Sequence, residues 1–549
     1  MRIRSRAIAI AVCVVALLSA ACSDRYPPTD VASATRGDDT RGILRIASQQ
    51  QPDGMSTLQG EQYIDTDLSM LWASYLFLWN DKDELIPDLA VEAPSMANHG
   101  ISRDGRTITY HLRKGVVWQD GAPFTADDVV FSWRQIMNPR NITGTRECYA
   151  LIQRIDTPDP HTVVVHLQRP YSPFVDTFFS MSSEAYSILP KHLLDKYSNL
   201  NDVPFDRLPI GTGPFRVVGN DHLKRIRFVA NESYWRGPPK LKEIDFEWVS
   251  DDRTLVKELT EHRIDLYLES AQALEPELHG IPGTTIYLYP FTRFADIGFN
   301  LDRPGLRDRG VREALAFATD RRSLIERVSH GVNLPTETDQ PPGSWAHSDS
   351  IVHYPYNPRR AAALLDAAGW RLSHDGVRRK DGRDMAYIMV GEDGSATALA
   401  AEREIVREWR AIGVRLTIRN YPSAKLYAQR QAGGVQQNGR FDVTFEQWGN
   451  GVDPDDSQLF TCDQTPPAGW NIYNFCDPAL DAAELKATTD YDRQSRKADY
   501  ATIQRILAVD LPILPVWFVQ RQDVANIDLR GYRPTSAISP LWNSWEWWR

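Results

Sequence analysis

Short strand patterns alternate with amphipathic helix patterns along much of this chain, and the alternation points to the mixed α/β class. Polar and apolar residues alternate at 107–113 and 161–167, which predicts two strands. The segments 310–330 and 493–511 have the apolar spacing of helices, and the mostly apolar segment 66–79 is also predicted to be helical. Because the chain has 549 residues, we expect two or three domains.

The first residues have the pattern of an export signal. Three arginines among the first six residues precede an apolar run at 7–18, which is too short to span a bilayer comfortably. Small residues then lead to Cys22, so we expect residues 1–21 to be a signal peptide and Cys22 to carry lipid. Ser19 stands where a lipobox usually has leucine, and ordinary cleavage near residue 21 is the alternative. Residues 22–40 are polar and predict the anchor and its flexible tether.

Composition and motifs exclude several functional classes. The net charge of -10 argues against a nucleic-acid partner. The sequence has no metalloprotease, Walker or nucleophile-elbow motif, and its histidines are scattered, so we expect no enzyme activity, no metal site and no cofactor. The close acidic residues Asp453, Asp455 and Asp456 lack the glycine and glutamate of a calcium loop.

The cysteines are consistent with export. Cys462 and Cys476 flank a turn-rich segment, and a disulfide between them would close a short loop in an oxidising compartment. Two buried, reduced thiols are the alternative. Cys148 is left without a predicted partner.

Several longer motifs occur in a familiar order from about residue 43 to near the C-terminus. They are Pro87–Ala90 with Ser102–Gly105, Tyr110–Gly115, Trp118–Gly121, Pro123–Phe131, Gly211–Phe215, Asn231–Trp235, Phe299–Asn300 with Val311–Leu315 and Ala318–Asp320, and Arg496–Ile513. On these motifs the chain resembles the extracellular solute-binding proteins of the oligopeptide, dipeptide and nickel transport group, known as family 5.

The resemblance implies a two-lobe periplasmic-binding-protein fold of type II, similar to cluster C, with a third inserted domain and a ligand cleft between the lobes. The predicted first lobe comprises 41–76, 205–293 and 516–549, the inserted domain 77–204, and the second lobe 294–515. Gly211 and Gly213 are expected to permit a tight crossover between lobes.

The resemblance also implies a function. It predicts a monomeric substrate-binding lipoprotein at the periplasmic or cell-surface face of the membrane. This protein would capture an oligopeptide or dipeptide and deliver it to the permease of an ABC importer. The alternatives are a non-peptide solute, such as an oligosaccharide, an opine or a metal chelate, or a peptide-sensing lipoprotein that is not an importer subunit.

In the peptide-binding members a strand ends in a tryptophan, and an aspartate a few residues later pairs with the α-ammonium of the peptide. Trp448 matches that tryptophan, and Asp453-Pro454 matches the acidic-proline pair that closes the motif. The interval is one residue shorter here, so the position of the ammonium-binding aspartate falls on Asn450 or Gly451. Either Asp453 takes over this role, or the protein does not bind a free peptide N-terminus.

Two further expectations come from the resemblance. Tyr63 lies near a segment that contributes to the cleft in relatives, which makes it a candidate ligand contact. Cys462 and Cys476 occupy the place where dipeptide-binding relatives carry a disulfide near the cleft, which favours the oxidised pair.

Overall fold

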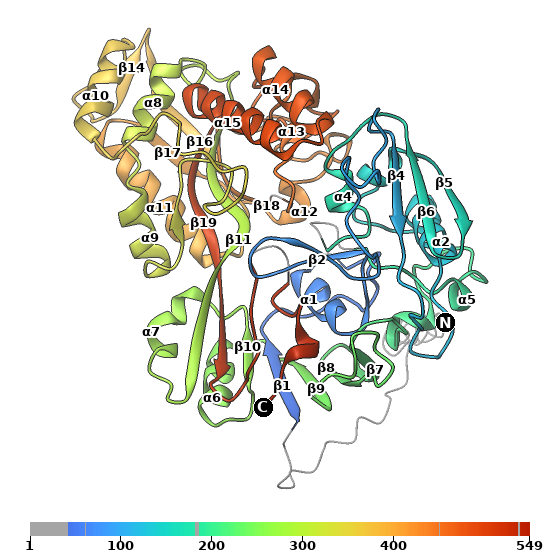
Figure 1. The fold of residues 1–549 in the computed structure, drawn as a ribbon. Helices are drawn as coiled ribbons and strands as arrows, with labels where there is room; N and C mark the ends of the chain where they lie inside the picture. The colour runs from blue at the N-terminus through green and yellow to red at the C-terminus, as the bar shows by residue number, and fades with distance from the viewer. Residues whose placement is uncertain (1–41, 61, 182–185, 450, 536–538) are drawn as a thin grey trace, which may run out of the picture.

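The computed structural model describes residues 42–549 except 61, 182–185, 450 and 536–538 (Figure 1). The predicted signal peptide, the tether and Cys22 therefore lie outside the described residues, as does the candidate ligand contact Asn450. Within the described part of the chain, no helix has the length and apolar character needed to cross a membrane.

One large mixed sheet runs through the molecule. Its strands lie in the order β17-β16-β18-β11-β19-β10-β1-β9-β8-β7, and β12 pairs with β19 beside this path. The strands are β1 (Ile43–Ser48), β7 (Phe215–Asp221), β8 (Arg225–Ala230), β9 (Glu243–Trp248), β10 (Leu266–Leu268), β11 (Thr284–Phe299), β12 (Leu334–Pro335), β16 (Ala386–Val390), β17 (Arg415–Ile418), β18 (Val443–Gly449) and β19 (Ile513–Asn526).

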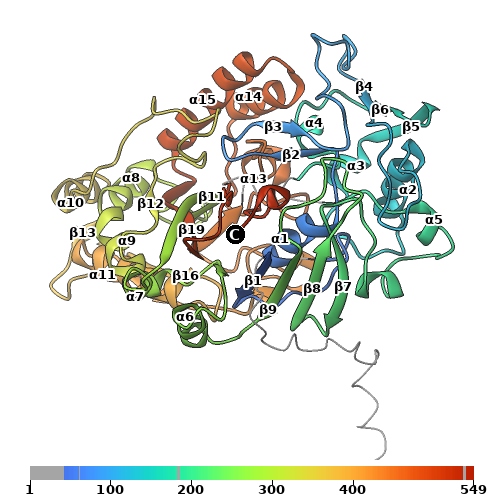
Figure 2. The same cartoon turned by 60° about the horizontal axis from the view of Figure 1, so that its bottom comes forward.

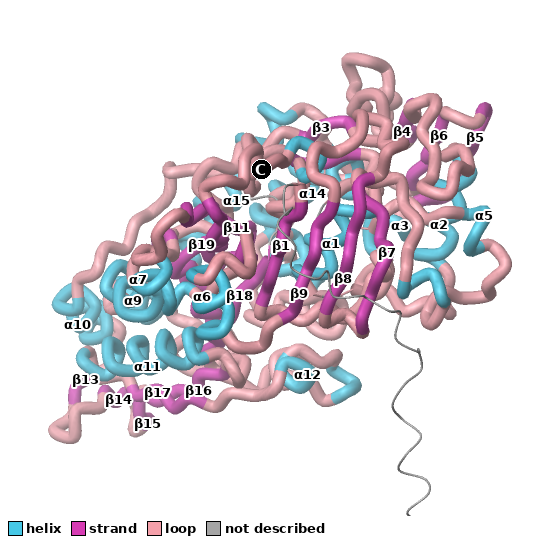
Figure 3. The backbone as a smooth tube through the Cα atoms, turned by 90° about the horizontal axis from the view of Figure 1, so that it is seen from below, coloured by secondary structure: helices cyan, strands magenta, loops and turns pink. Residues whose placement is uncertain are grey.

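Two long antiparallel strands, β11 and β19, connect the two lobes of the molecule (Figure 1). Their lower ends join β10, β1, β9, β8 and β7 in the first lobe, where the last four strands lie side by side (Figure 3). Their upper ends join β18, β16 and β17 in the second lobe. The predicted boundaries at 293/294 and 515/516 fall inside these strands; the domain limits themselves stay a prediction.

The first lobe surrounds its part of the sheet with short helices and packs one apolar core on each side of β1. Leu44 and Ile46 of β1 are fully buried in one of these cores, and Ala47 is fully buried in the other. The helices of this lobe are α1 (Tyr63–Trp72), α6 (Asp252–Thr260) and α7 (Glu275–Leu278).

The second lobe carries most of the helices of the molecule. They are α8 (Arg309–Phe317), α9 (Arg321–Ser329), α10 (Pro358–Ala367), α11 (Ala396–Ala411), α12 (Ser423–Leu426), α13 (Ser457–Phe460), α14 (Pro478–Thr489) and α15 (Arg493–Asp510), with a small sheet of β13 (Arg371–Leu372), β14 (Arg378–Lys380) and β15 (Arg383–Asp384). The predicted single helix at 310–330 is wrong, because Asp320 interrupts it. The Asp320 side chain accepts a hydrogen bond from the Ser323 amide and starts α9 as a separate helix.

A third, smaller domain lies beside the lobes (Figure 2). It contains β4 (Thr107–His111), β5 (Ile152–Asp159), β6 (Thr162–Leu167), α2 (Ala126–Met137), α3 (Glu147–Ala150), α4 (Phe174–Thr177) and α5 (Lys191–Leu194). The strand predictions at 107–113 and 161–167 correspond to β4 and β6. Thr125 begins α2 through a capping box with Asp128, because each side chain bonds the backbone amide of the other residue.

The predicted helix at 66–79 is only partly correct. The helix α1 ends at Trp72, and residues 77–79 form β2 (Phe77–Trp79), which pairs with β3 (Leu85–Pro87). Between them, the Leu76 amide donates to the Phe179 carbonyl and the Leu89 amide donates to the Tyr75 carbonyl. These long-range bonds replace helical ones, so tertiary pairing overrides the apolar pattern of the segment.

Gly211 and Gly213 have a different role from the one predicted. The chain crosses between the two lobes along β11 and β19, and both glycines instead pack against the end of α1. A Cβ atom at Gly211 would lie 1.8 Å from the Trp72 carbonyl oxygen, and one at Gly213 would lie 2.5 Å from the Trp72 carbonyl carbon. These glycines therefore permit a close backbone approach.

Candidate functional site

The candidate site lies between the lobes, where β11 crosses from one to the other. A cavity of about 230 Å³ opens there. Its lining comes from Phe291 and Thr292 of β11, the turn at 79–84, the loop at 340–345 and the segment that follows β18. The cavity is large enough for a side chain or a small group and smaller than a typical ligand pocket.

Tyr63 begins α1 and projects toward β11. Its ring meets the ring of Phe291 edge to face, with centroids 4.9 Å apart. On β11, the guanidinium of Arg293 lies over the Tyr63 ring, 4.5 Å from its centroid. A Cβ atom at Gly449, the last residue of β18, would lie 3.6 Å from the Tyr63 hydroxyl. Tyr63 of the first lobe and the end of β18 in the second lobe therefore lie side by side.

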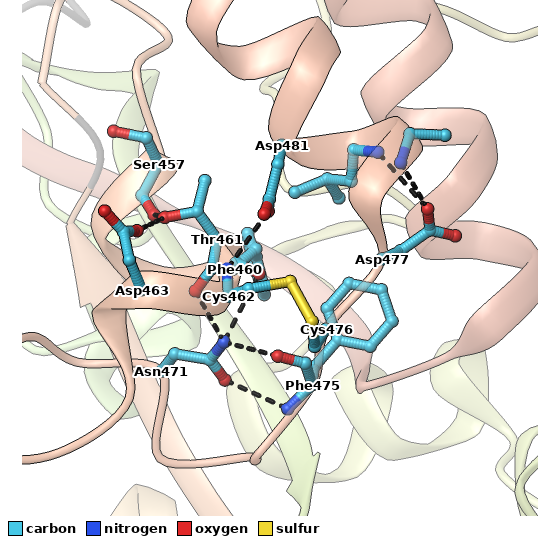
Figure 4. The surroundings of a disulfide bond; sticks show 12 residues. Ser457, Phe460, Thr461, Cys462, Asp463, Asn471, Phe475, Cys476, Asp477 and Asp481 are labelled. Atoms are coloured by element: carbon cyan, nitrogen blue, oxygen red, sulfur yellow. Dashed lines mark hydrogen bonds between the residues drawn. A yellow bond between two sulfur atoms is a disulfide. The ribbon is translucent and has the colours of Figure 1, made fainter.

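Trp448 is half-buried near the end of β18, opposite Phe294 of β11 in the antiparallel ladder. Its ring centroid lies 6.3 Å from that of Trp470. Trp470 belongs to the segment between Cys462 and Cys476, which a disulfide closes (Figure 4). Trp470 of the disulfide loop is therefore the aromatic neighbour of Trp448, the tryptophan of the sequence motif.

Side-chain bonds hold the ends of the disulfide loop. The Asn471 amide donates to the carbonyl groups of Phe460, Thr461 and Phe475, and its carbonyl accepts from the Phe475 amide (Figure 4). Because Asn471 is fully buried, each of these bonds replaces one that water would otherwise make. These bonds hold the chain at Asn471, the residue that follows Trp470.

Asp453 is buried in the loop after β18 and is already paired. Both of its carboxylate oxygens lie 2.7 Å from Nη2 of Arg496 on α15. The Arg496 Nε atom donates to the Ala487 carbonyl, and the guanidinium also lies over the Trp345 ring. The two side chains are 3% and 7% exposed, so this is a buried ion pair. Asp453 therefore meets a protein cation in this structure.

A second acidic group faces the same pair from the third domain. Burial, and then repulsion from the Asp453 carboxylate, raises the pKa of Asp176 on α4 to about 7. Arg496 and Arg493 act in the opposite direction on this pKa. Asp176 and Asp453 thus form a carboxyl pair across the contact between the third domain and the second lobe.

Further bonds close that contact. The Tyr171 hydroxyl donates to the Asp455 carboxylate at 2.8 Å, and the Ser172 amide donates to the Thr488 carbonyl at 2.7 Å. The Tyr491 hydroxyl donates to the carbonyl of Gly105 at 2.8 Å. The third domain consequently touches the second lobe directly, without passing through the first lobe.

The end of β18 leaves a free strand edge beside the cavity. β11 pairs with β18 from Val443 to Gly449 on one side. On the other side β16 pairs only with Val443 and Thr444. Within the described residues, no strand pairs with the outer edge of β18 beyond Thr444. Phe445 and Glu446 are buried, so the part of this edge that a ligand can reach runs from Gln447 to Gly449.

Two pairs of buried carboxyl groups lie in the second lobe near this loop. Burial and Glu446 raise the pKa of Asp296 well above its usual range, and burial raises the pKa of Glu484 to about 8 beside Asp456. Burial therefore disfavours the charged form of the carboxyl groups in each pair. Among the described residues, no group of histidine, cysteine and acidic side chains has the geometry to hold a metal ion.

Sequence reasoning did not identify Arg293, Arg496 or Asp176. Arg496 was included only as the start of a helix motif, and its partner Asp453 is 43 residues away on another element. The one available signal for Arg293 is a basic residue between Thr292 and the mostly apolar end of β11, which also contains Asp296. Of the predicted site residues, Tyr63 lies beside Gly449, the neighbour of Trp448, whereas the carboxylate of Asp453 is held by Arg496.

Comparisons with known proteins agree with this architecture. The dipeptide-binding protein of Escherichia coli is 27% identical over 479 residues, covering 83% of this chain and 84% of the relative. The oligopeptide-binding protein AppA of Bacillus subtilis is 24% identical over 97% of both chains. The crystal structure of NikZ from Campylobacter jejuni in complex with Ni(L-His) superposes with a TM-score of 0.75 at 26% identity, covering 93% of this chain and 100% of NikZ.

The family model named "Bacterial extracellular solute-binding proteins, family 5 Middle" matches residues 84–470. The predicted fold class is confirmed: the molecule has the two-lobe, type II binding-protein fold with a third domain and a cleft between the lobes. The chain belongs to family 5 of the bacterial extracellular solute-binding proteins.

Proposed function

We propose that this protein captures a peptide between its lobes and delivers it to the permease of an ABC importer. The observation that carries the proposal is the outer edge of β18 from Gln447 to Gly449, which no described strand pairs with and which is not buried. An extended peptide can add to such an edge as one more strand and bond to it through its backbone.

The surroundings of this edge suit a ligand of variable sequence. Backbone pairing is independent of side chains, so the same edge accepts many peptides. Trp448 and Tyr63 offer aromatic faces to the peptide side chains, and the nearby cavity gives one of them space. The relatives named as dipeptide-binding and oligopeptide-binding proteins support the same ligand class.

Transport requires that the permease distinguish the loaded protein from the empty one. Rotation of the lobes about β11 and β19 would bury the peptide, and only the closed form would dock productively on the permease. We propose that the protein acts as a monomer and that the transporter, not this chain, consumes ATP.

The test is calorimetry with di- to pentapeptides on the protein from residue 23 onward, which keeps every residue that the structure describes. The tightest binder is then N-methylated at one position at a time. Because alternate residues of a strand point their amides toward the same neighbour, affinity should fall at every second position.

A response to no peptide would overturn the peptide assignment. The screen would then move to oligosaccharides, opines and metal chelates. Peptide binding that is equally sensitive at all N-methylated positions would contradict strand addition at β18.

We also propose that the exported protein is anchored by lipid on Cys22. The support is the pattern of an arginine-rich start, an apolar run and small residues that end at this cysteine. Labelled palmitate should enter the wild-type protein in the producing bacterium and not the Cys22→Ala variant, which should appear in the soluble fraction. Equal labelling of both proteins would refute lipidation at Cys22.

A further inference from the structure

We propose that Arg293 is the receptor for a carboxylate of the bound peptide, so that the site recognises the acidic end of its ligand rather than the N-terminal ammonium. This inference rests on the proposed peptide function and specifies the chemistry of the same site. It assigns a charge-recognition role to a residue of β11 that lies outside the tryptophan-aspartate motif.

The contacts of Arg293 leave its hydrogen-bonding capacity largely unused. Its guanidinium lies over the rings of Tyr63 and Phe291, at 4.5 and 5.6 Å from their centroids. These stacks use the flat faces of the group and leave its N–H donors in the plane. One donor reaches the Gln447 side-chain oxygen at 3.4 Å, which is a long bond. In the described part of the chain, no carboxylate forms an ion pair with Arg293.

The local backbone directs Arg293 to the site. The register between β11 and β19 shifts between Pro290 and Phe294, so the chain at Arg293 departs from regular pairing with β19. Such irregularities commonly re-aim side chains next to binding sites. On the other side Arg293 pairs with Gly449, the exposed last residue of β18, which has no side chain to cover the guanidinium.

Asp453, in contrast to Arg293, already has a charged partner. Asp453 is the aspartate that remains in the motif, and both of its oxygens are held by Arg496. An incoming ammonium would have to displace a buried guanidinium to reach it, and this displacement would leave a charge without a partner. The free end of β18 is therefore bordered by an unpaired cation and by an aspartate that is already neutralised.

The ligand class follows from this polarity. A peptide that lies along the free edge of β18 can place its C-terminal carboxylate, or an acidic side chain, at Arg293, where two charge-assisted bonds can form. A blocked N-terminus would be tolerated, because Asp453, the aspartate that the motif provides for the ammonium, is already held by Arg496.

The experiment uses a polyalanine peptide of the length that binds most tightly in the screen above, in free, N-acetylated and C-amidated forms. In wild-type protein the acetylated peptide should bind as well as the free one, and the amide should bind about ten- to a hundredfold more weakly. An amidated peptide that contains one glutamate separates the two carboxylate sources, since recovery of binding identifies the side chain as sufficient.

Two variants test the residue itself, and a third serves as the control. Arg293→Gln should bind the free and amidated peptides equally, and Arg293→Lys should restore part of the preference because it keeps the charge. The matched control is Arg216→Gln, on the exposed face of β7 at the far end of the sheet, which should behave as wild type.

The outcomes are separable. Failure of every peptide to bind would overturn the proposed function and this inference together. Binding that needs a free amine and ignores the C-terminal amide would overturn the inference alone. If Arg293→Gln weakened the free and amidated peptides by the same factor, Arg293 would be a packing partner of Tyr63 and the carboxylate assignment would be refuted.

Discussion

Arg496 determines what Asp453 can do. The sequence motif suggests an acid that awaits a ligand, but the structure places a guanidinium 2.7 Å from both of its oxygens. A buried ion pair contributes little net stability compared with apolar packing, but removal of one partner leaves the other charged and desolvated. Arg496 therefore matters most for keeping two acidic groups, Asp453 and Asp176, in one buried place.

This arrangement predicts a large effect of Arg496→Met. We expect the free energy of unfolding to fall by about 3–5 kcal/mol, because Asp453 loses its buried cation. Urea unfolding followed by tryptophan fluorescence measures the change. The double variant Arg496→Met/Asp453→Asn should recover part of the loss, and Arg216→Met on exposed β7 is the control. A loss below about 1 kcal/mol would show that the pair is not buried in solution.

Some residues of the site can be recognised from the sequence, and others cannot. Trp448 is recognisable because a strand and an acidic-proline pair flank it in a short stretch of sequence. The ion pair of Asp453 and the stack of Tyr63 on Arg293 join residues that are 43 and 230 positions apart. No local pattern encodes such pairs, so they can be found only after the chain is folded.

Among the elements, predictions succeed where local signals are complete. The strands expected at 107–113 and 161–167 correspond to β4 and β6, and the helix expected at 493–511 corresponds to α15. Prediction fails where long-range hydrogen bonds determine the secondary structure. At 66–79, for example, β2 replaces the end of the predicted helix. It also fails at 310–330, where the apolar period continues across a break that Asp320 imposes.

The close contact between the end of α1 and the 211–213 segment predicts that a side chain at Gly211 destabilises the protein. Gly211→Ala would place a methyl group 1.8 Å from the Trp72 carbonyl oxygen. Because backbone atoms must then move, we expect a loss of about 1–3 kcal/mol in the free energy of unfolding. Gly54→Ala is the control, since its nearest atom would lie 3.8 Å away. Equal stability of the two variants would contradict the packing role.

For the molecule as a whole, the contact between the third domain and the second lobe carries a dependence on pH. The pKa of Asp176 is raised to about 7 in the folded protein, whereas an unfolded aspartate titrates near pH 4. The folded form therefore keeps a proton that the unfolded chain releases. Stability that is fully present below about pH 4 is lost as the pH rises from about 4 to about 7.

Asp176→Asn should remove this contribution. We expect the variant to be more stable than wild type by about 2 kcal/mol at pH 8 and similar to it at pH 4. Urea unfolding at both pH values gives the comparison. The control is Asp195→Asn, which replaces an exposed aspartate at the end of α5. A variant whose advantage is the same at both pH values would contradict the assignment.

The path of the chain through the central sheet has a consequence for the time at which the protein can fold. Asp67 of α1 bonds to Arg521 of β19, 454 residues later, and Arg549 donates to the carbonyl of Ile43. The first lobe therefore stays unfinished until almost the whole chain has been synthesised, and contacts of this kind slow folding. For a chain that we propose to be exported, the central sheet of the first lobe therefore cannot be completed, and cannot obstruct passage through a translocation channel, before β19 has emerged from the ribosome.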